Sequence, residues 1–197
     1  MTAPILVTGA KGMLGRTVLR RFAGRNIVAS DRASLDLTDA DAVAVTIASL
    51  RPNVVINCAA MTTVDRCESE RDAAFAANAT APANLATACQ RHGTRLVHIS
   101  TDYVFPGNLD RPYHEGDAVG PRTAYGQSKL AGEEAVRRVC ADHLILRTAW
   151  LYGSGGPSFV HTMLKLGSQA GPPLRVVDDQ QGNPTSTDAL VTAIITL

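Results

Sequence analysis

Short apolar runs along the chain alternate with longer stretches in which apolar positions recur every three or four residues. The runs are continuous, which is typical of strands covered by helices on both faces of a sheet. We predict strands at residues 5–8, 27–30, 54–57, 96–100, 144–147 and 174–177, and helices at 13–24, 39–50, 71–92, 125–139 and 158–169. This alternation predicts a Rossmann-type, doubly wound α/β fold with a parallel sheet of strand order 3-2-1-4-5-6.

Local signals set some boundaries of these elements. Thr38 is expected to cap the second helix, and Gly93 is expected to end the third helix in a left-handed conformation. Residues 101–123 and 149–157 lack a regular period and follow predicted strands. In a parallel sheet such loops lie at the carboxyl edge, where ligands bind, so we expect both loops to be functional.

Composition and charge exclude several classes of protein. The chain has 197 residues, 45% of them hydrophobic, which is enough for one main domain. A net charge of +1 argues against a nucleic-acid or anionic-membrane surface and favours a small metabolite as partner. The first residues lack a basic region ahead of a long apolar stretch, so we expect a soluble, cytoplasmic protein. Four scattered cysteines predict neither disulfides nor a metal site.

The sequence T-G-A-K-G-M-L-G lies between the first predicted strand and the first predicted helix. Glycines in this spacing permit a tight turn, close approach of backbone N–H groups to a pyrophosphate, and close packing of the helix on the strand. A structural strand-turn-helix is the alternative, but the position at the first strand-helix junction favours dinucleotide binding. The residues expected to contact the cofactor here are Gly9, Lys11, Gly12, Met13, Leu14 and Gly15.

Asp31 ends the second predicted strand, where an acidic side chain binds the adenosine ribose of an unphosphorylated cofactor. Arg32 follows it and can pair with a 2′-phosphate, so we expect use of both NADH and NADPH. A surface turn pair is the alternative for these two residues. The further expected cofactor contacts are Asp36 and Leu37 beside the adenine, and Cys58, Ala59 and Ala60 after the third strand.

Tyr125 and Lys129 are spaced by four on a predicted helix, so both side chains lie on one face. A nearby ammonium is expected to lower the pKa of the phenol toward the range of an acid–base catalyst. Thr101 ends the fourth strand at the same sheet edge, and we prefer its hydroxyl to that of Ser100 as a partner for a substrate carbonyl. Taken alone, Tyr125 and Lys129 could simply lie on a solvated helical face. Taken alone, the Thr101 hydroxyl could simply cap a helix or turn.

The motifs T-G-x-x-G-x-x-G, N-C-A-A, S-T-D-Y-V-F and Y-x-x-x-K, in this order, resemble the extended short-chain dehydrogenase/reductase superfamily. Four longer motifs resemble the dTDP-4-dehydrorhamnose reductase family within it: STDYVFPG (100–107), YGQSKLAGE (125–133), RTAWLYG (147–153) and VVDDQQGNPTS (176–186). The resemblance spans essentially the whole chain.

The resemblance implies a catalytic triad of Thr101, Tyr125 and Lys129, with Tyr125 and Lys129 also touching the NADPH or NADH cofactor. It implies a sugar-nucleotide substrate whose 4-keto group is reduced, as in the formation of dTDP-L-rhamnose. The implied substrate contacts are Val64, Thr101, Asp102, Tyr103, Trp150 and Ser158, with the 179–185 region nearby. We expect residues 1–150 to form the NAD(P)-binding domain and 151–197 part of a substrate-binding region. The assembly that we expect is a homodimer.

Two departures from the family pattern and two rival functions remain. Ser158 stands where relatives usually carry Asn, and the chain stops at Leu197 within an apolar stretch where relatives continue, so we expect an incomplete substrate lobe. A sugar-nucleotide dehydratase or epimerase is one rival, but dehydratases typically carry Asp-Glu after the Thr, and this chain has Asp102-Tyr103. The other is a non-catalytic subunit similar to the regulatory subunit of methionine adenosyltransferase, which would not need the complete triad.

Overall fold

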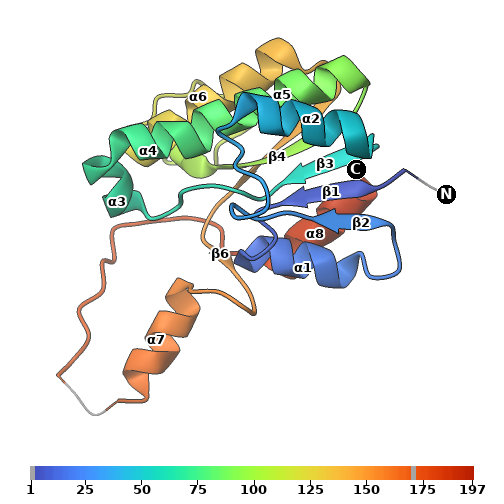
Figure 1. Cartoon of the computed structure of the whole chain (residues 1–197). Helices are drawn as coiled ribbons and strands as arrows, with labels where there is room; N and C mark the ends of the chain where they lie inside the picture. Colours follow the sequence, from blue (N-terminus) through green and yellow to red (C-terminus); the bar gives the residue numbers. More distant parts are fainter. Residues whose placement is uncertain (1–2, 170–171) are drawn as a thin grey trace.

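A parallel five-stranded sheet forms the centre of the protein (Figure 1). The computed structural model describes residues 3–169 and 172–197. The strands are β1 (Ile5–Thr8), β2 (Ile27–Ala29), β3 (Val54–Asn57), β4 (Arg95–Thr101) and β5 (His143–Thr148). The helices are α1 (Met13–Arg21), α2 (Ala40–Leu50), α3 (Val64–Ser69), α4 (Arg71–Phe75), α5 (Ala81–His92), α6 (Ala124–Val139), α7 (Phe159–Gly167) and α8 (Thr187–Thr196). A second, two-stranded sheet pairs β6 (Leu151–Tyr152) with β7 (Thr185–Ser186).

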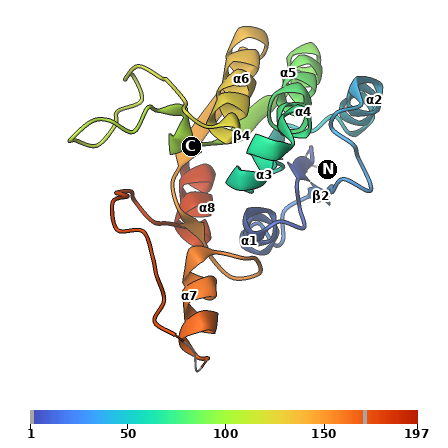
Figure 2. The same ribbon diagram turned by 90° about the vertical axis from the view of Figure 1, so that its left-hand side faces the viewer.

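Helices cover both faces of the central sheet, with α2, α5 and α6 on one side and α1 and α8 on the other (Figure 2). Successive strand residues point to opposite faces. Leu6 and Leu96 therefore pack toward α2, α5 and α6, whereas Val7 and Val97 pack toward α1 and α8. The continuous apolar runs of the sequence are explained by this burial on two sides, and the predicted doubly wound fold class is confirmed.

The predicted strand order is wrong, because the sheet runs β2-β1-β3-β4-β5. Residues 30–39, between β2 and α2, form turns and no further strand. The chain therefore crosses the sheet through α2 and adds β3 to the free edge of β1, on the side away from β2. The direction of strand addition reverses at β1, which makes the carboxyl ends of β1 and β3 the topological switch point where such sheets bind ligands.

Some of the other local predictions are confirmed and some are wrong. Gly93 ends α5 with φ 62°, as predicted. Thr38 does not cap α2; the Asp39 carboxylate accepts hydrogen bonds from the Asp41 and Ala42 amides instead. The predicted strand 174–177 is an extended segment without a strand partner, and its residue Val177 is 68% exposed. An apolar run forms a strand only where a neighbouring strand satisfies its backbone groups, and here none does.

The described residues after 150 include one helix that stands away from the core and one that packs into it. The domain boundary expected at residue 150 stays a prediction. Helix α7 buries none of its residues and stands away from the sheet in both views (Figures 1 and 2). Helix α8 instead packs Leu190 and Val191 into the core beside α1, and Arg20 pairs with Asp188 at 2.8 Å. Sequence reasoning missed α8, whose N-cap is Ser186. Among the described residues, no helix is long and apolar enough to cross a bilayer.

We predict that Gly9→Ala destabilises the protein more than Gly24→Ala. Both glycines have positive φ, 65° and 89°, which for an alanine costs about 1–2 kcal/mol. A Cβ at Gly9 would also lie 2.6 Å from the Ala59 amide nitrogen, whereas at Gly24 nothing lies within 4 Å. Urea unfolding of the two variants measures the difference; equal losses would show that β1 and β3 do not require this close approach.

Candidate active site

The glycine-rich turn after β1 is held against the end of β3 by backbone contact. A side chain at Gly9 would collide with the backbone of Cys58 and Ala59, and one at Gly15 would collide with the Gly9 carbonyl. The Gly12 amide closes the turn by donating to the Gly9 carbonyl at 2.9 Å. The turn therefore meets the end of β3 through backbone contacts at the switch point, where Cys58 and Ala59 lie against Gly9.

The first turn of α1 is suited to an anion. Gly12 is the N-cap, it makes no side-chain cap bond, and no acidic residue lies in the first turn. The first N–H groups of a helix have no partner within the helix, and the helix dipole favours negative charge there. Of the predicted neighbours, Lys11 is exposed, Met13 is half-buried and Leu14 is buried in the core. These features fit a dinucleotide pyrophosphate.

Asp31 and Lys11 form an ion pair where β2 ends. The same Asp31 carboxylate accepts hydrogen bonds from the Ala33 and Ser34 amides, both at 3.0 Å. The Lys11 side chain is the largest cause that lowers the pKa of Asp31 to about 2. The negative charge of Asp31 is therefore already compensated, and Arg32 beside it is exposed.

The two residues predicted beside the adenine lie differently. Asp36 is exposed and accepts hydrogen bonds from the Thr38 amide and hydroxyl at 2.9 and 2.7 Å. Leu37 is 8% exposed and packs in the core with α2 and α5. The structure therefore leaves Asp36, but not the Leu37 side chain, open to solvent at this edge.

Helix α6 carries Tyr125 and Lys129 and packs closely on two turns. Thr123 caps it, with the Gly126 amide donating to the Thr123 hydroxyl at 3.1 Å. A side chain at Gly126 would collide with the Tyr103 carbonyl, and one at Gly132 with the Asn78 carbonyl. The two glycines thus let α6 lie directly against the 3₁₀ turn Asp102–Val104 and the π-helical turn Ala76–Thr80.

The π-helical turn interrupts the helix predicted at residues 71–92. It places Asn78 in the interior, where its amide accepts from the Met61 amide and donates to the Met61 carbonyl and the Ser128 hydroxyl. A π turn within a helix is rare and frequently lies at a functional site. Sequence reasoning missed Asn78; the one signal for it was a polar residue within an alanine-rich helical stretch.

Lys129 is 2% exposed, and its ammonium donates to the Ile99 carbonyl of β4 at 2.6 Å. Burial disfavours the charged form and lowers the pKa of Lys129 to about 8, against the opposing charge of Glu133. The Lys129 side chain therefore links α6 to β4, and it also places a cation at the site.

The side chain of Tyr125 is half-buried beside Thr101 and Tyr103. Burial raises the pKa of Tyr125 to about 12, while a hydrogen bond with the Thr101 side chain acts in the opposite direction. The expected lowering of this pKa by Lys129 is therefore wrong for this structure. The desolvation of the phenol dominates, and the Lys129 ammonium is bonded to the Ile99 carbonyl.

Thr101 is the predicted triad member that begins the loop after β4. Its hydroxyl donates to the Asp102 carboxylate at 3.0 Å and accepts from the Tyr103 amide at 3.2 Å. Burial raises the pKa of Asp102. The Tyr103 ring meets the Tyr125 ring edge-on, with centroids 5.5 Å apart. The structure therefore brings Thr101, Asp102 and Tyr103 together with Tyr125.

The remaining predicted substrate contacts lie around the edge of the site. Trp150 is 45% exposed with φ 47°, a strained conformation for an aromatic residue, and a Cβ at Gly182 would lie 3.1 Å from its ring. Val64 begins α3 and is half-buried. Ser158 is the N-cap of α7, where its hydroxyl accepts from the His161 amide, so this oxygen already has a structural use.

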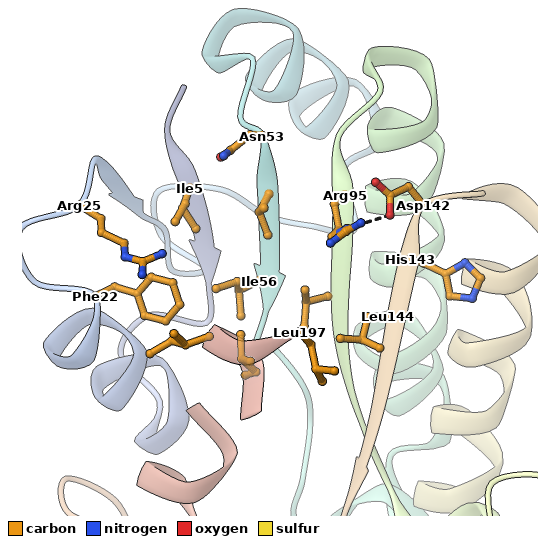
Figure 3. A pocket seen from close by; sticks show the side chains of 14 residues that line it. Ile5, Phe22, Arg25, Asn53, Ile56, Arg95, Asp142, His143, Leu144 and Leu197 are labelled. Carbon is orange, nitrogen blue, oxygen red and sulfur yellow. Dashed lines mark hydrogen bonds and ion pairs between the residues drawn. The ribbon is translucent and has the colours of Figure 1, made fainter. Parts of the chain in front are cut away.

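A hollow in the surface lies at the other end of the sheet (Figure 3). Its lining includes Ile5, Phe22, Leu144 and Leu197, with an Arg95–Asp142 ion pair at one side. These residues stand where β1 and β5 begin and where α1 and α8 end. Ligands of open parallel sheets bind at the opposite, carboxyl edge, so the hollow is separate from the candidate active site.

A family model described as the RmlD substrate binding domain matches residues 2–197. The chain belongs to this family. The match confirms the resemblance to extended short-chain dehydrogenases/reductases that the motifs indicated.

Several relatives of this RmlD-family chain carry names of reductases. It is 51% identical over 195 residues to a dTDP-4-dehydrorhamnose reductase of Streptomyces griseus, covering 98% of this chain and 64% of that protein. It is 44% identical to a dTDP-4-keto-6-deoxy-D-glucose reductase of Streptomyces niveus, covering 100% of this chain and 69% of that protein. A dTDP-4-dehydrorhamnose reductase of Bacillus anthracis, solved in complex with NADP, has a TM-score of 0.96 at 39% identity and covers 100% of this chain and 70% of that one. The chain thus spans about two thirds of the length of these relatives.

We predict that the stability of Lys129→Met relative to wild type is about 1–3 kcal/mol more favourable at pH 7 than at pH 9.5, because the substitution removes an ammonium whose burial is penalised at pH 7. The pKa of about 8 in the folded protein lies below the ordinary lysine value of 10.5. The penalty is therefore complete below pH 8 and is relieved as pH rises toward 10.5, so the relative gain should shrink over that range. Denaturant unfolding at pH 7 and 9.5 measures it, with exposed Lys165→Met as a control expected to change little. A difference from wild type that is the same at the two pH values would contradict the burial penalty.

Proposed function

We propose that the protein reduces the C4 keto group of a nucleotide-linked 4-keto-6-deoxy sugar with NADPH or NADH, most specifically dTDP-4-dehydro-L-rhamnose to dTDP-L-rhamnose. The observation that carries the proposal is the proximity of Thr101 to Tyr125, with buried Lys129 one helical turn after Tyr125 on the same face of α6, at the edge where the glycine-rich turn can hold a dinucleotide. The names of the relatives support the substrate class and the NADP-bound neighbour supports the cofactor. In the proposal, the reaction takes place in the cytoplasm.

The cofactor, when bound, supplies a hydride to C4 of the sugar. The Tyr125 phenol gives its proton to the ketone oxygen, so that one hydride and one proton convert the ketone to an alcohol. A phenol with a pKa of about 12 is protonated at neutral pH, which is the form that a proton donor needs. The Thr101 hydroxyl holds the ketone oxygen in place, and the Lys129 ammonium stabilises the negative charge that Tyr125 acquires.

The remaining assignments follow the resemblance residue by residue. In the proposal, residues 1–150 bind the cofactor and residues 151–197 contribute to the sugar-nucleotide site. The proposed cofactor contacts are Gly9, Lys11, Gly12, Met13, Leu14, Gly15, Asp31, Arg32, Asp36, Leu37, Cys58, Ala59, Ala60, Tyr125 and Lys129. The proposed substrate contacts are Val64, Thr101, Asp102, Tyr103, Trp150 and Ser158.

A reductase fits the site better than a dehydratase does. The position after Asp102 is occupied by Tyr103, whose ring packs on Tyr125, so no second carboxylate stands there to assist loss of water. Asp102 itself is bonded to Thr101. The site thus holds one phenol donor with its hydroxyl partner, which suffices for ketone reduction.

We predict that Tyr125→Phe keeps the fold and the NAD(P)H affinity but lowers kcat by about 10²–10⁴-fold, because only the donor hydroxyl is removed. Single-turnover loss of NAD(P)H absorbance with a panel of 4-keto sugar nucleotides measures it. Tyr113→Phe removes a hydroxyl that bonds Asn108 in an exposed loop, and it should leave kcat close to that of wild type. Near-normal turnover by Tyr125→Phe on every ketone that wild type reduces would refute the proposed mechanism.

We predict that wild type uses both NADPH and NADH, and that Arg32→Ala weakens NADPH binding selectively. The Asp31 charge that would repel a 2′-phosphate is compensated by Lys11, while the exposed Arg32 guanidinium can pair with that phosphate. Calorimetric dissociation constants for the two cofactors measure the selectivity, with exposed Arg51→Ala on α2's C-cap as the control. An equal loss of both cofactors would remove Arg32 from the phosphate site.

A further inference from the structure

Glu133 is a buried carboxylate to which the proposed reduction gives no step. It follows Tyr125 and Lys129 at intervals of four, so all three residues lie on one face of α6. Its side chain is 0% exposed. Burying a carboxylate is unfavourable unless cations and hydrogen bonds compensate it, so its partners must account for its presence there.

Two arginines pair with this carboxylate from different elements. Arg147 of β5 donates to both oxygens, from Nε at 2.9 Å and from Nη2 at 2.7 Å. Arg137, one turn further along α6, donates at 2.7 Å from a side chain that is 44% exposed. Burial acts to raise the pKa of Glu133, but hydrogen bonds and charge from Arg147 and the charge of Arg137 lower it below the usual value. Glu133 is therefore ionised at neutral pH.

Arg147 connects this anion to the loop after β4. Its guanidinium carbon lies 4.7 Å from the centroid of the Phe105 ring, the geometry of a cation–π contact. Phe105 in turn stacks on Tyr113, with centroids 4.4 Å apart and planes 10° apart. The loop that begins at Thr101 and Asp102 is thus fastened, through Arg147, to the helix that carries Tyr125.

Glu133 also faces Lys129. The titratable groups that act on Lys129 from packed elements are Glu133 on α6, Cys58 after β3 and His98 on β4. Burial raises the pKa of Cys58 to about 12 and lowers that of His98 well below its usual value, so both are neutral at pH 7. Glu133 is then the one charged group of these three, and it favours the protonated form of Lys129.

We propose that Glu133 is a positioning residue of the active site: its carboxylate holds Arg147 against the Phe105 ring and places a negative charge near the Lys129 ammonium. One buried charge thereby fixes both the loop after β4 and the cation one helical turn after Tyr125. The role of Lys129 in turnover rests on the proposed function, but the pairing of charges does not, so it is tested first without substrate.

The first experiment follows Lys129 itself. The chain contains three lysines, Lys11, Lys129 and Lys165, so NMR of protein labelled with ¹³C at lysine Cε gives a simple spectrum, assigned with Lys11→Arg and Lys165→Arg. In wild type the Lys129 signal should titrate near pH 8. Glu133→Gln keeps the side-chain shape and removes the charge. A nearby opposite charge changes a pKa by about 1–3 pH units. Because two arginines also pair with Glu133, we expect its removal to lower the Lys129 midpoint by about one pH unit.

Matched variants separate charge from position. Glu134→Gln changes the neighbouring, exposed glutamate and should leave the Lys129 midpoint where it is. Arg137→Gln removes the outer guanidinium and should not lower the midpoint. If Glu133→Gln does not fold, Glu133→Asp, with its carboxylate withdrawn by one methylene, should lower the midpoint by a smaller amount. A Lys129 midpoint that stays at the wild-type value in the folded Glu133 variant overturns the proposal.

The second experiment tests the loop. Arg147→Lys keeps the charge beside Glu133 but loses the bidentate pairing with the Glu133 carboxylate and the stacking on the Phe105 ring. KM for the sugar nucleotide should rise roughly 5–10-fold with a smaller change in kcat, and Lys129 should still titrate near pH 8. An unchanged KM overturns the part assigned to Arg147. If wild type reduces no 4-keto sugar nucleotide, the proposed function fails, and the same loop test is made with the dissociation constant of a sugar nucleotide.

Discussion

The burial of the Lys129 ammonium is the constraint on which the rest of the site depends. A cation in the interior requires a partner, and Lys129 finds it in the Ile99 carbonyl, two residues before the end of β4. This bond sets the register of α6 along β4. Tyr125, one helical turn earlier, is thereby placed beside Thr101, the last residue of the strand. A single polar contact thus aligns the three residues proposed to reduce a ketone.

Close backbone contacts allow that register to form. Gly126 and Gly132 remove the side chains that would keep α6 away from the Tyr103 and Asn78 carbonyls. Gly9 does the same between β1 and β3. The proposed cofactor turn and the proposed catalytic helix therefore rest on the same device, which is a glycine where two backbones must touch. The proposed cofactor turn lies against the end of β3, and the proposed catalytic helix is bonded to β4. Because β3 pairs with β4, the sheet sets the distance between the turn and the helix.

The sequence was sufficient for most of the strands, and the bounds of β1 and β3 were predicted to the residue, because short continuous apolar runs have few other uses in an α/β protein. The strand order was not predictable, since the pattern of apolar runs does not specify on which side of β1 the third strand is added. The spacing of Tyr125 and Lys129 predicted their shared face. It did not predict the direction of the Tyr125 pKa shift, which depends on burial, nor the π turn at Asn78, which depends on packing against α6.

The central claim is that this carboxyl edge carries out hydride transfer to C4 of a 4-keto sugar, with the proton supplied by the protein. The most direct measurement uses NADPH carrying deuterium at the transferable position of nicotinamide C4, with a dTDP-4-keto-6-deoxy sugar as acceptor, and locates the label in the product by NMR. The account predicts one deuterium on sugar C4 with a single configuration. Oxidation of the cofactor without deuterium at C4, or label at another sugar carbon, would contradict it.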